Sequence, residues 1–214
     1  MSIENQEVVS GVPAESPRRG RPRDARADEA IVRAALELLA ERGVHAFRMD
    51  DVASRAGVGK AAIYRRHRSK ERLVAAAVGA LVSEIALPDT GSTRGDLLSL
   101  MYDAVALYSR PSASGLMAGL VEAMRHSDEL AEAVRGEFLV ARREALKTVI
   151  ERGVVRGDLD ADLDVELALD VLGGPLFYRL LVTGGPIDEQ LAEGVVDLIL
   201  EGFGTTEGRH AEGA

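Results

Sequence analysis

Apolar residues near the start of this chain recur at intervals of three and four residues, the pattern of a helix with one buried face. A helix is predicted from about Asp28 to about Arg42, and Gly43 is placed to end it in a left-handed cap. The apolar positions of its buried face are Ile31, Ala34, Ala35, Leu38 and Leu39.

Two short helices are predicted next, separated by a glycine turn. The apolar positions of the first are Met49, Val52, Ala53 and Ala56. Gly57 ends this helix, and the next begins near Lys60 with Ile63 facing inward. Ser69 is a suitable N-cap for a fourth helix, which is predicted to run to about Ile85.

Pro88 and Gly91 interrupt the helical pattern and mark a predicted domain boundary. Five further helices are predicted near residues 94–109, 113–125, 127–152, 164–182 and 187–203. Pro175 should kink or break its helix, because proline removes a backbone donor and clashes with the preceding turn. No stretch alternates with a two-residue period, so an all-α fold of nine helices is predicted.

Composition divides the chain into four parts. Residues 1–26 are predicted to be a disordered tail that ends in a basic arm, since the first 17 residues are polar and aperiodic. Residues 27–73 form a first helical domain, residues 74–204 form a second, and residues 205–214 form a tail.

Charge is distributed unevenly between these parts. The formal net charge is -9, but residues 18–72 hold 15 Lys and Arg against 8 Asp and Glu, a net +7. The remainder holds 11 against 27, a net -16. Because neutralising DNA phosphates requires clustered cations rather than a positive total, this asymmetry favours a basic, DNA-facing head on an acidic body.

Several function classes are excluded by what the sequence lacks. The chain has no Cys, so no disulfide framework, thiolate metal site or cysteine nucleophile is possible. The four His have no ligand spacing and no Ser or Thr stands in a nucleophile motif, so neither metal, cofactor nor catalysis is predicted. The longest apolar run, Leu73 to Val82, is about half a membrane span, and no signal-peptide pattern is present. We expect a cytoplasmic protein without membrane contact.

The helices on either side of Gly57 have the layout of a helix-turn-helix at residues 49–67. Such a motif needs a bracing helix, a tight turn and a second helix that presents its N-terminal side chains to the major groove. The outward positions of the second helix are Lys60, Ala61, Ala62, Tyr64, Arg65 and Arg66. Double-stranded DNA is therefore the predicted partner.

The stretch from Val52 to Lys70 resembles the DNA-binding domain of the tetracycline-repressor (TetR) family. The matching elements are Val52-Ala53, Ala56-Gly57-Val58, Ile63-Tyr64 and Ser69-Lys70. The resemblance covers residues 27–73, and the whole chain fits the family's length and nine-helix plan. It implies a transcriptional regulator, not an enzyme, with a helix-turn-helix domain followed by a helical ligand-binding and dimerisation domain.

Four positions depart from the family's usual pattern. The family commonly has Ser or Thr at the positions of Arg48 and Gly59, an aromatic residue at that of His67, and Pro at that of Arg68. Glycine is a tolerable cap before a helix but offers no side-chain acceptor. The two added cations, His67 and Arg68, should strengthen phosphate contact.

The candidate DNA contacts are of two kinds. Lys60, Ala62 and Arg65 are candidate base readers, because cationic side chains can donate to guanine and a methyl group can contact thymine. The resemblance implies that Tyr64 and Lys70 hold phosphates, a role that a phenol and an ammonium can fill. The other interface candidates are Arg48, Gly59, Arg66 and Arg68.

The basic arm has a weaker motif of its own. Arg19-Gly20-Arg21-Pro22 resembles the core of an AT-hook, in which an extended backbone lays arginines into a narrow minor groove. Two interpretations remain open for Arg19 and Arg21: entry into the minor groove beside the helix-turn-helix, or loose contact with phosphates.

For the second domain, the resemblance implies a small-molecule pocket among the middle helices and a four-helix dimer interface built from the last two. The candidate pocket residues are Met101, Tyr102, Tyr108, Met117, Leu120, Met124, Phe138 and Phe177. The candidate dimer residues are Val171, Leu172, Leu191, Val195, Leu198 and Ile199. For any one pocket residue, ordinary core packing is the alternative.

These observations predict a homodimeric repressor that a small-molecule effector releases from a pseudo-palindromic operator. An activator or an effector-independent regulator would use the same motifs. A helical ligand-binding protein or enzyme with an incidental basic segment is a more remote alternative.

Overall fold

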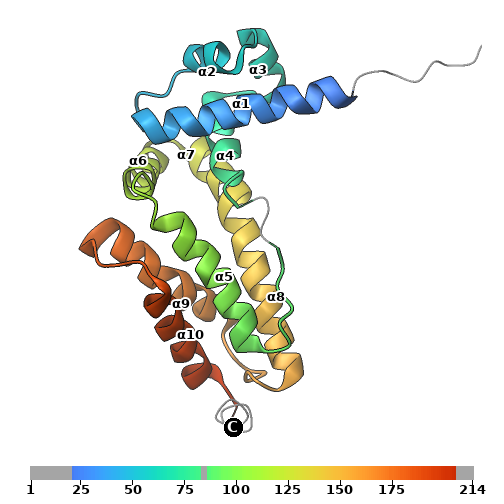
Figure 1. Ribbon diagram of the computed structural model, residues 1–214, viewed down its shortest axis with the longest axis vertical. Helices are drawn as coiled ribbons and strands as arrows, with labels where there is room; N and C mark the ends of the chain where they lie inside the picture. The colour runs from blue at the N-terminus through green and yellow to red at the C-terminus, as the bar shows by residue number, and fades with distance from the viewer. Residues whose placement is uncertain (1–20, 83–85, 206–214) are drawn as a thin grey trace, which may run out of the picture.

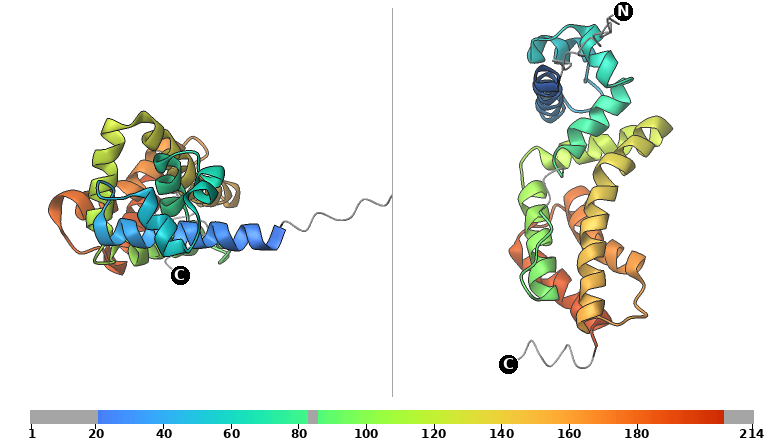
Figure 2. Two further views of the ribbon diagram at one scale, coloured as in Figure 1. Left: turned by 90° about the horizontal axis from the view of Figure 1, so that it is seen from above. Right: turned by 90° about the vertical axis from the view of Figure 1, so that its right-hand side faces the viewer.

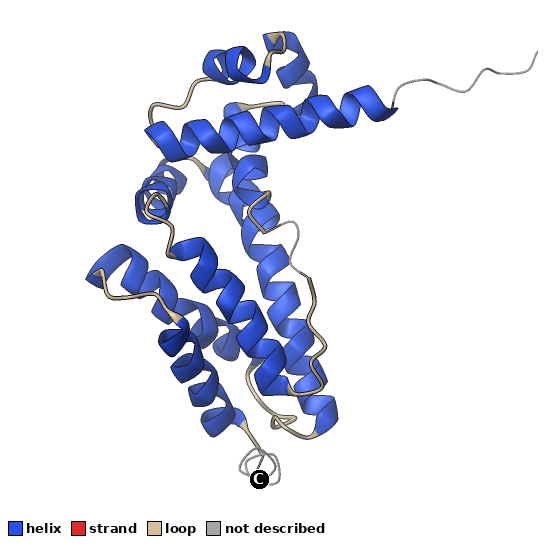
Figure 3. Cartoon of the chain, in the orientation of Figure 1, coloured by secondary structure: helices blue, strands red, loops and turns tan. Residues whose placement is uncertain are grey.

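The computed structural model describes residues 21–82 and 86–205, and their regular structure is helical (Figures 1 and 3). The elements are α1 (Arg21–Arg42), α2 (Met49–Ala56), α3 (Lys60–Arg66), α4 (Lys70–Gly79), α5 (Thr93–Tyr108), α6 (Ala113–His126), α7 (Asp128–Val134), η1 (Arg135–Leu139), α8 (Val140–Arg156), α9 (Val165–Tyr178), η2 (Arg179–Thr183) and α10 (Glu189–Phe203). With α7, η1 and α8 counted as one continuous helix, and α9 with η2 as another, nine helices are described. The predicted all-α class is confirmed.

Residues 21–82 form a head on one end of the molecule. In Figure 1, α1 crosses above the helices of residues 86–205. Helices α2 and α3 lie on the side of α1 that faces away from those helices, and α4 descends beneath α1. The apolar core of the head continues into that of the body, and its members buried in the head include Ile31, Leu38, Leu39, Val52, Ile63 and Leu73. Because α1 contacts both α2 and α4, its buried face fixes the position of the helix-turn-helix.

Residues 86–205 form an elongated body below the head (Figure 2). Helices α5 and α8 run along it, and α9 and α10 pack against α5 on one side. The head joins the body through two contacts: α4 packs on α7 and η1, and α1 packs on α6. A change in the body can therefore reach the head through either α1 or α4.

A buried polar network ties the start of α5 to the end of α8. Asp96 has no exposed surface and accepts hydrogen bonds from the Thr90 amide (2.6 Å), the Thr90 hydroxyl (2.8 Å) and the Arg156 guanidinium (3.0 Å). Burial opposes its ionisation, but these hydrogen bonds outweigh burial and hold the pKa of Asp96 below its ordinary value. The network fixes the loop before α5 on the body.

Two helix boundaries near the head differ from prediction. The first helix begins at Arg21, not near Asp28. Proline is favoured in a first helical turn, where its missing N–H would have no partner, so Pro22 does not prevent this earlier start. The fourth helix ends at Gly79, not near Ile85, because the Leu81 and Val82 amides bond three residues back and tighten the chain into a turn.

A kink or a break was predicted at Pro175, and the helix does not break there. Helix α9 continues through Pro175 to Tyr178 and then widens into the π turn η2, which Gly184 ends at φ 65°. Leu172 and Leu176 are fully buried on either side of the proline. Their packing stabilises the helix despite the lost hydrogen bond.

The predicted helix over 127–152 is longer than expected and contains a π turn, η1. It ends at Arg156, where Gly157 adopts φ 84°. The π turn lies against α4: a Cβ added to Gly79 would come within 3.1 Å of both the Cβ and the carbonyl oxygen of Glu137. Glycine at position 79 of α4 therefore favours this close approach.

Candidate functional site

The helix-turn-helix forms as the residue spacing predicts. Gly57 adopts φ 66° and ends α2, and the Val58 amide donates to the Ala53 carbonyl at 3.0 Å. Val52 and Ile63 are fully buried and hold α2 and α3 together. A left-handed glycine between two short helices thus turns α3 across α2.

Ion pairs fix α2 on α1. The Arg55 guanidinium donates to both carboxylate oxygens of Glu41, at 2.6 and 2.8 Å, and Arg42 pairs with Asp51 at 2.7 Å. The hydrogen bond from Arg55 also lowers the pKa of Glu41, despite a small opposing effect of burial. A bidentate guanidinium–carboxylate pair adds geometric specificity, so these pairs orient the helix-turn-helix.

Helix α3 presents an outer face of polar and small residues. Lys60, Tyr64 and Arg65 are exposed, Tyr64 at 44%, while Ala62 is half-buried. Lys60 Nζ lies 2.7 Å from Asp50 Oδ1, and this hydrogen bond raises the pKa of Lys60. Lys60 therefore stays charged, and its ammonium pairs with Asp50, which the sequence interpretation did not include.

Arg66 and His67 turn toward α1 and away from the outer face. Arg66 Nη1 donates to the Ala62 carbonyl at 2.9 Å, and its side chain is only 18% exposed. The His67 side chain is 11% exposed and its Nε2 lies 3.3 Å from Asp28 Oδ1. Both side chains therefore help to brace α3 against α1.

The remaining candidates flank the two helices. Arg48 is exposed at the N-cap of α2, and Gly59 precedes α3 with an extended backbone; neither supplies a side-chain cap. Arg68 is exposed, and half-buried Lys70 has its ammonium 6.0 Å from the centre of the Phe47 ring.

The predicted basic arm is described only in part. Arg19 lies outside the described residues. Arg21 is the first residue of α1, so the extended backbone expected of an AT-hook core is not adopted there.

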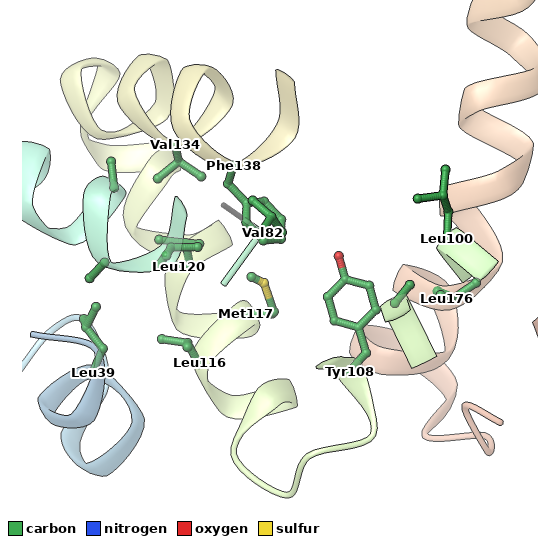
Figure 4. Close-up of a cluster of buried hydrophobic side chains, with 14 of the residues drawn as sticks. Leu39, Val82, Leu100, Tyr108, Leu116, Met117, Leu120, Val134, Phe138 and Leu176 are labelled. Carbon is green, nitrogen blue, oxygen red and sulfur yellow. The ribbon is translucent and has the colours of Figure 1, made fainter. Parts of the chain in front are cut away.

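A cavity of about 90 Å³ lies between the head and the body. It is lined by Leu36, Ala40, Leu81, Leu107, Tyr108, Arg110, Ser112, Ala113, Leu116, Met117 and Phe138. Of the predicted pocket residues, Tyr108, Met117 and Phe138 are among them, and all three appear in Figure 4. The sequence interpretation missed Leu36 and Ala40, which come from α1 in the head.

The other five predicted pocket residues do not line this cavity. Met101 and Leu120 are buried in the core, and Met124 is half-buried against it. The Tyr102 hydroxyl donates to Glu193 at 3.2 Å, toward α10. The Phe177 ring packs on Tyr108 with centroids 5.2 Å apart, so it supports a cavity residue from behind.

The predicted dimer residues divide into two groups. Leu172, Val195 and Ile199 are buried in the chain's own core, at 0, 5 and 1% exposure, so they cannot line an interface. Val171 and Leu191 are half-buried and Leu198 is 56% exposed. The exposed large apolar residues of α9, η2 and α10 are Leu167, Tyr178, Leu181, Val182 and Leu198.

Two further findings concern the described residues alone. No helix over 21–82 and 86–205 has both the length and the apolar character to cross a membrane. Nor does this part of the chain bring together a cluster of three His, Cys or carboxylate side chains that could hold a metal ion.

Comparison with known proteins places this geometry in a family. A model described as "Bacterial regulatory proteins, tetR family" matches residues 31–77, and "Tetracyclin repressor-like, C-terminal domain" matches residues 87–199. The chain is 34% identical to the uncharacterized HTH-type transcriptional regulator YdeS of Bacillus subtilis, over 87% of this chain and 92% of that protein. It is 32% identical to the DNA-binding transcriptional repressor TetR of Mycobacteroides abscessus, over 85% and 94%.

A solved structure has the same fold. The crystal structure of the TetR family transcription regulator SCO0332 is similar with a TM-score of 0.71 and 27% identity, over 82% of this chain and 97% of that one. The helix-turn-helix head, the helical body and both family matches lead to one conclusion: the chain belongs to the TetR family of helix-turn-helix transcriptional regulators and is not an enzyme.

Proposed function

We propose that this regulator is a homodimeric, cytoplasmic repressor that a small-molecule effector releases from a pseudo-palindromic operator. The proposal assigns DNA binding to residues 27–73, and effector binding and dimerisation to residues 74–204. The observation that carries it is the outer face of α3, where Lys60, Tyr64 and Arg65 stand exposed on a helix that α1 and α2 hold rigidly.

In this proposal the outer face of α3 enters the major groove. Lys60, Ala62 and Arg65 read base edges, and Tyr64 and Lys70 hold phosphates on either side. Arg48 and Arg68 add phosphate contacts, and Gly59 leaves room for the DNA backbone beside the start of α3. Lys60 must leave its ion pair with Asp50 to contact DNA. Part of the free energy gained in the DNA contact therefore offsets the lost ion pair.

The dimer interface is assigned to the exposed apolar side of α9, η2 and α10. Leu167, Val171, Tyr178 and Leu181 follow helical spacing along α9 and η2, and Leu198 extends the surface onto α10. Gly174, Gly194 and Gly202 have open space where a side chain would stand. An apolar surface of this extent marks an interaction site, and a second copy would place two α3 helices about one DNA turn apart.

The effector acts, in this proposal, through the cavity between head and body. Its lining joins residues of α5 and α6 to α1, which packs on α2, and to η1, which packs on α4. A ligand that binds better when these elements are further apart would change the distance between the heads of the two subunits. It can release DNA only to the extent that it binds the released state better.

The relative that is named a repressor supports repression over activation. An activator or an effector-independent regulator would use the same DNA contacts, and the position of the operator relative to the promoter separates these alternatives.

The test is retardation of a fragment from upstream of the protein's own gene, by wild-type protein and by the Tyr64→Ala, Lys70→Ala double variant, across a series of salt concentrations. We expect retardation by the wild type alone, weakening steeply with salt as counterions compete for phosphates. No retardation at low salt would refute the proposed operator binding.

A further inference from the structure

The cavity between head and body is lined in part by a tyrosine whose hydroxyl is buried. The Tyr108 side chain is 4% exposed, and among the described residues its hydroxyl has no hydrogen-bond partner. Figure 4 shows the ring beside Met117 and Phe138, with the oxygen pointing away from the α5 backbone. Buried polar groups in proteins are almost always paired, so an unpaired one on a side chain that lines a cavity points to a ligand.

Contacts on the ring hold this hydroxyl in place. The Phe177 ring packs on Tyr108 with centroids 5.2 Å apart, and the Arg142 guanidinium carbon lies 5.7 Å from the ring centre. Burial raises the pKa of Tyr108, although Arg142 opposes this slightly, so the phenol stays neutral and able to donate. The hydroxyl is thus a positioned donor.

The rest of the lining limits what can bind there. Most lining side chains are aliphatic or aromatic, and the polar ones, Arg110 and Ser112, are exposed. An apolar cavity of roughly 150 Å³ accommodates benzene, so a volume of about 90 Å³ suits a molecule of one small ring or a short chain, with limited widening. A buried charge would be costly here, because the one charged residue of the lining, Arg110, is exposed.

We propose that this cavity binds a small, uncharged, mostly apolar molecule that accepts a hydrogen bond from the Tyr108 hydroxyl. The assignment of this molecule as the effector rests on the proposed function. Its position explains how binding reaches DNA: the ligand touches Leu36 and Ala40 of α1 directly. It also touches Phe138, in the π turn whose neighbour Glu137 lies against Gly79 of α4.

The test is calorimetric titration of the full chain with three probes of similar size: phenol, toluene and benzoate. We expect phenol to bind tightest, because it alone combines an apolar ring with a neutral oxygen. Tyr108→Phe should weaken phenol binding roughly tenfold, the value of one neutral hydrogen bond, and leave toluene binding unchanged. Tyr102→Phe is the matched control: its hydroxyl bonds Glu193 on another face, so phenol binding should persist.

Three results would overturn the inference. Equal phenol binding by wild type and Tyr108→Phe would mean that the hydroxyl does not anchor the ligand. Preference for benzoate would indicate an anion site organised by Arg110, and failure of all three probes to bind would leave the cavity without a ligand role. The same samples are then tested on operator DNA. Tyr108-dependent phenol binding that leaves DNA affinity unchanged would uphold the cavity assignment and refute effector release.

Discussion

The head and the body use their aromatic and charged side chains in opposite ways. In the head, Tyr64 and Arg65 stand exposed on a short helix whose inner residue, Ile63, is fully buried. In the body, Tyr108 and Phe138 are buried around a small cavity. In our proposal the head therefore presents its chemistry to DNA, whereas the body encloses a small ligand. On that proposal, specificity for DNA and specificity for the ligand can change independently.

The largest effect is expected on the stability of the body, which depends on the buried carboxylate of Asp96. Asp96→Asn should lower the free energy of unfolding by about 3 kcal/mol, because it leaves Arg156 without its buried carboxylate. The pKa of Asp96 is lowered in the folded state, so its contribution is present above the unfolded pKa of about 4 and is lost as pH falls through the folded value.

Urea unfolding of the two proteins at a series of pH values measures this contribution. Asp103→Asn, which changes an exposed carboxylate on the same helix, is the control and should have little effect. An Asp96→Asn deficit that did not shrink toward low pH would contradict the assignment.

The next largest effect is expected on association of two subunits through the proposed dimer interface. Leu198→Glu should weaken association by about 2 kcal/mol or more, because it places a charge in the proposed apolar interface. Val155→Glu alters a side chain that is 88% exposed on α8 and should leave association unchanged. Sedimentation equilibrium measures both variants. If both variants weakened association equally, or if neither weakened it, the interface would lie elsewhere.

Within the head, Arg65→Ala should cost about 1–3 kcal/mol of operator affinity and relax sequence preference, as the loss of a base-reading contact does. Arg125→Ala removes the same charge from an exposed position on α6 in the body and should change affinity far less. Fluorescence anisotropy on operator and scrambled DNA measures both. A loss identical on the two DNAs would reassign Arg65 to phosphate contact.

The smallest effect concerns the ion pair that occupies Lys60. Asp50→Asn should tighten operator binding by roughly threefold or less, because Lys60 no longer exchanges one carboxylate partner for DNA and exposed ion pairs are weak. The same anisotropy assay checks this, with Glu29→Gln, which removes an exposed carboxylate of α1, as the control. Weaker binding by Asp50→Asn would show that the aspartate positions Lys60 for DNA.

The sequence predicted the head well because its determinants are local. The helix end at Gly57, the Ser69 cap and the buried pair Val52 and Ile63 follow from spacing within a few residues, and the structure confirms each of them. The approach of Arg66 to Asp28 was not predicted, since Asp28 lies on another helix whose placement no local pattern encodes.

For the body, the sequence predicted the helices but not how they pack on one another. Periodicity marks Leu198 and Ile199 alike as apolar, but only packing decides that the first is exposed and the second is buried. The cavity combines Leu36 of α1 with Phe138 of η1, which are far apart in the chain. Sites that depend on long-range packing therefore escaped prediction, as did the π turn that positions Phe138.

The central claim is that α3 reads a specific operator. The most direct test is genome-wide selection of bound fragments at physiological salt, with wild-type protein and with the Tyr64→Ala, Lys70→Ala double variant. We expect the wild type alone to recover a short inverted repeat. Recovery of the same undifferentiated A·T-rich DNA by both proteins would contradict the claim. DNA binding would then be attributed to the basic residues that precede α1.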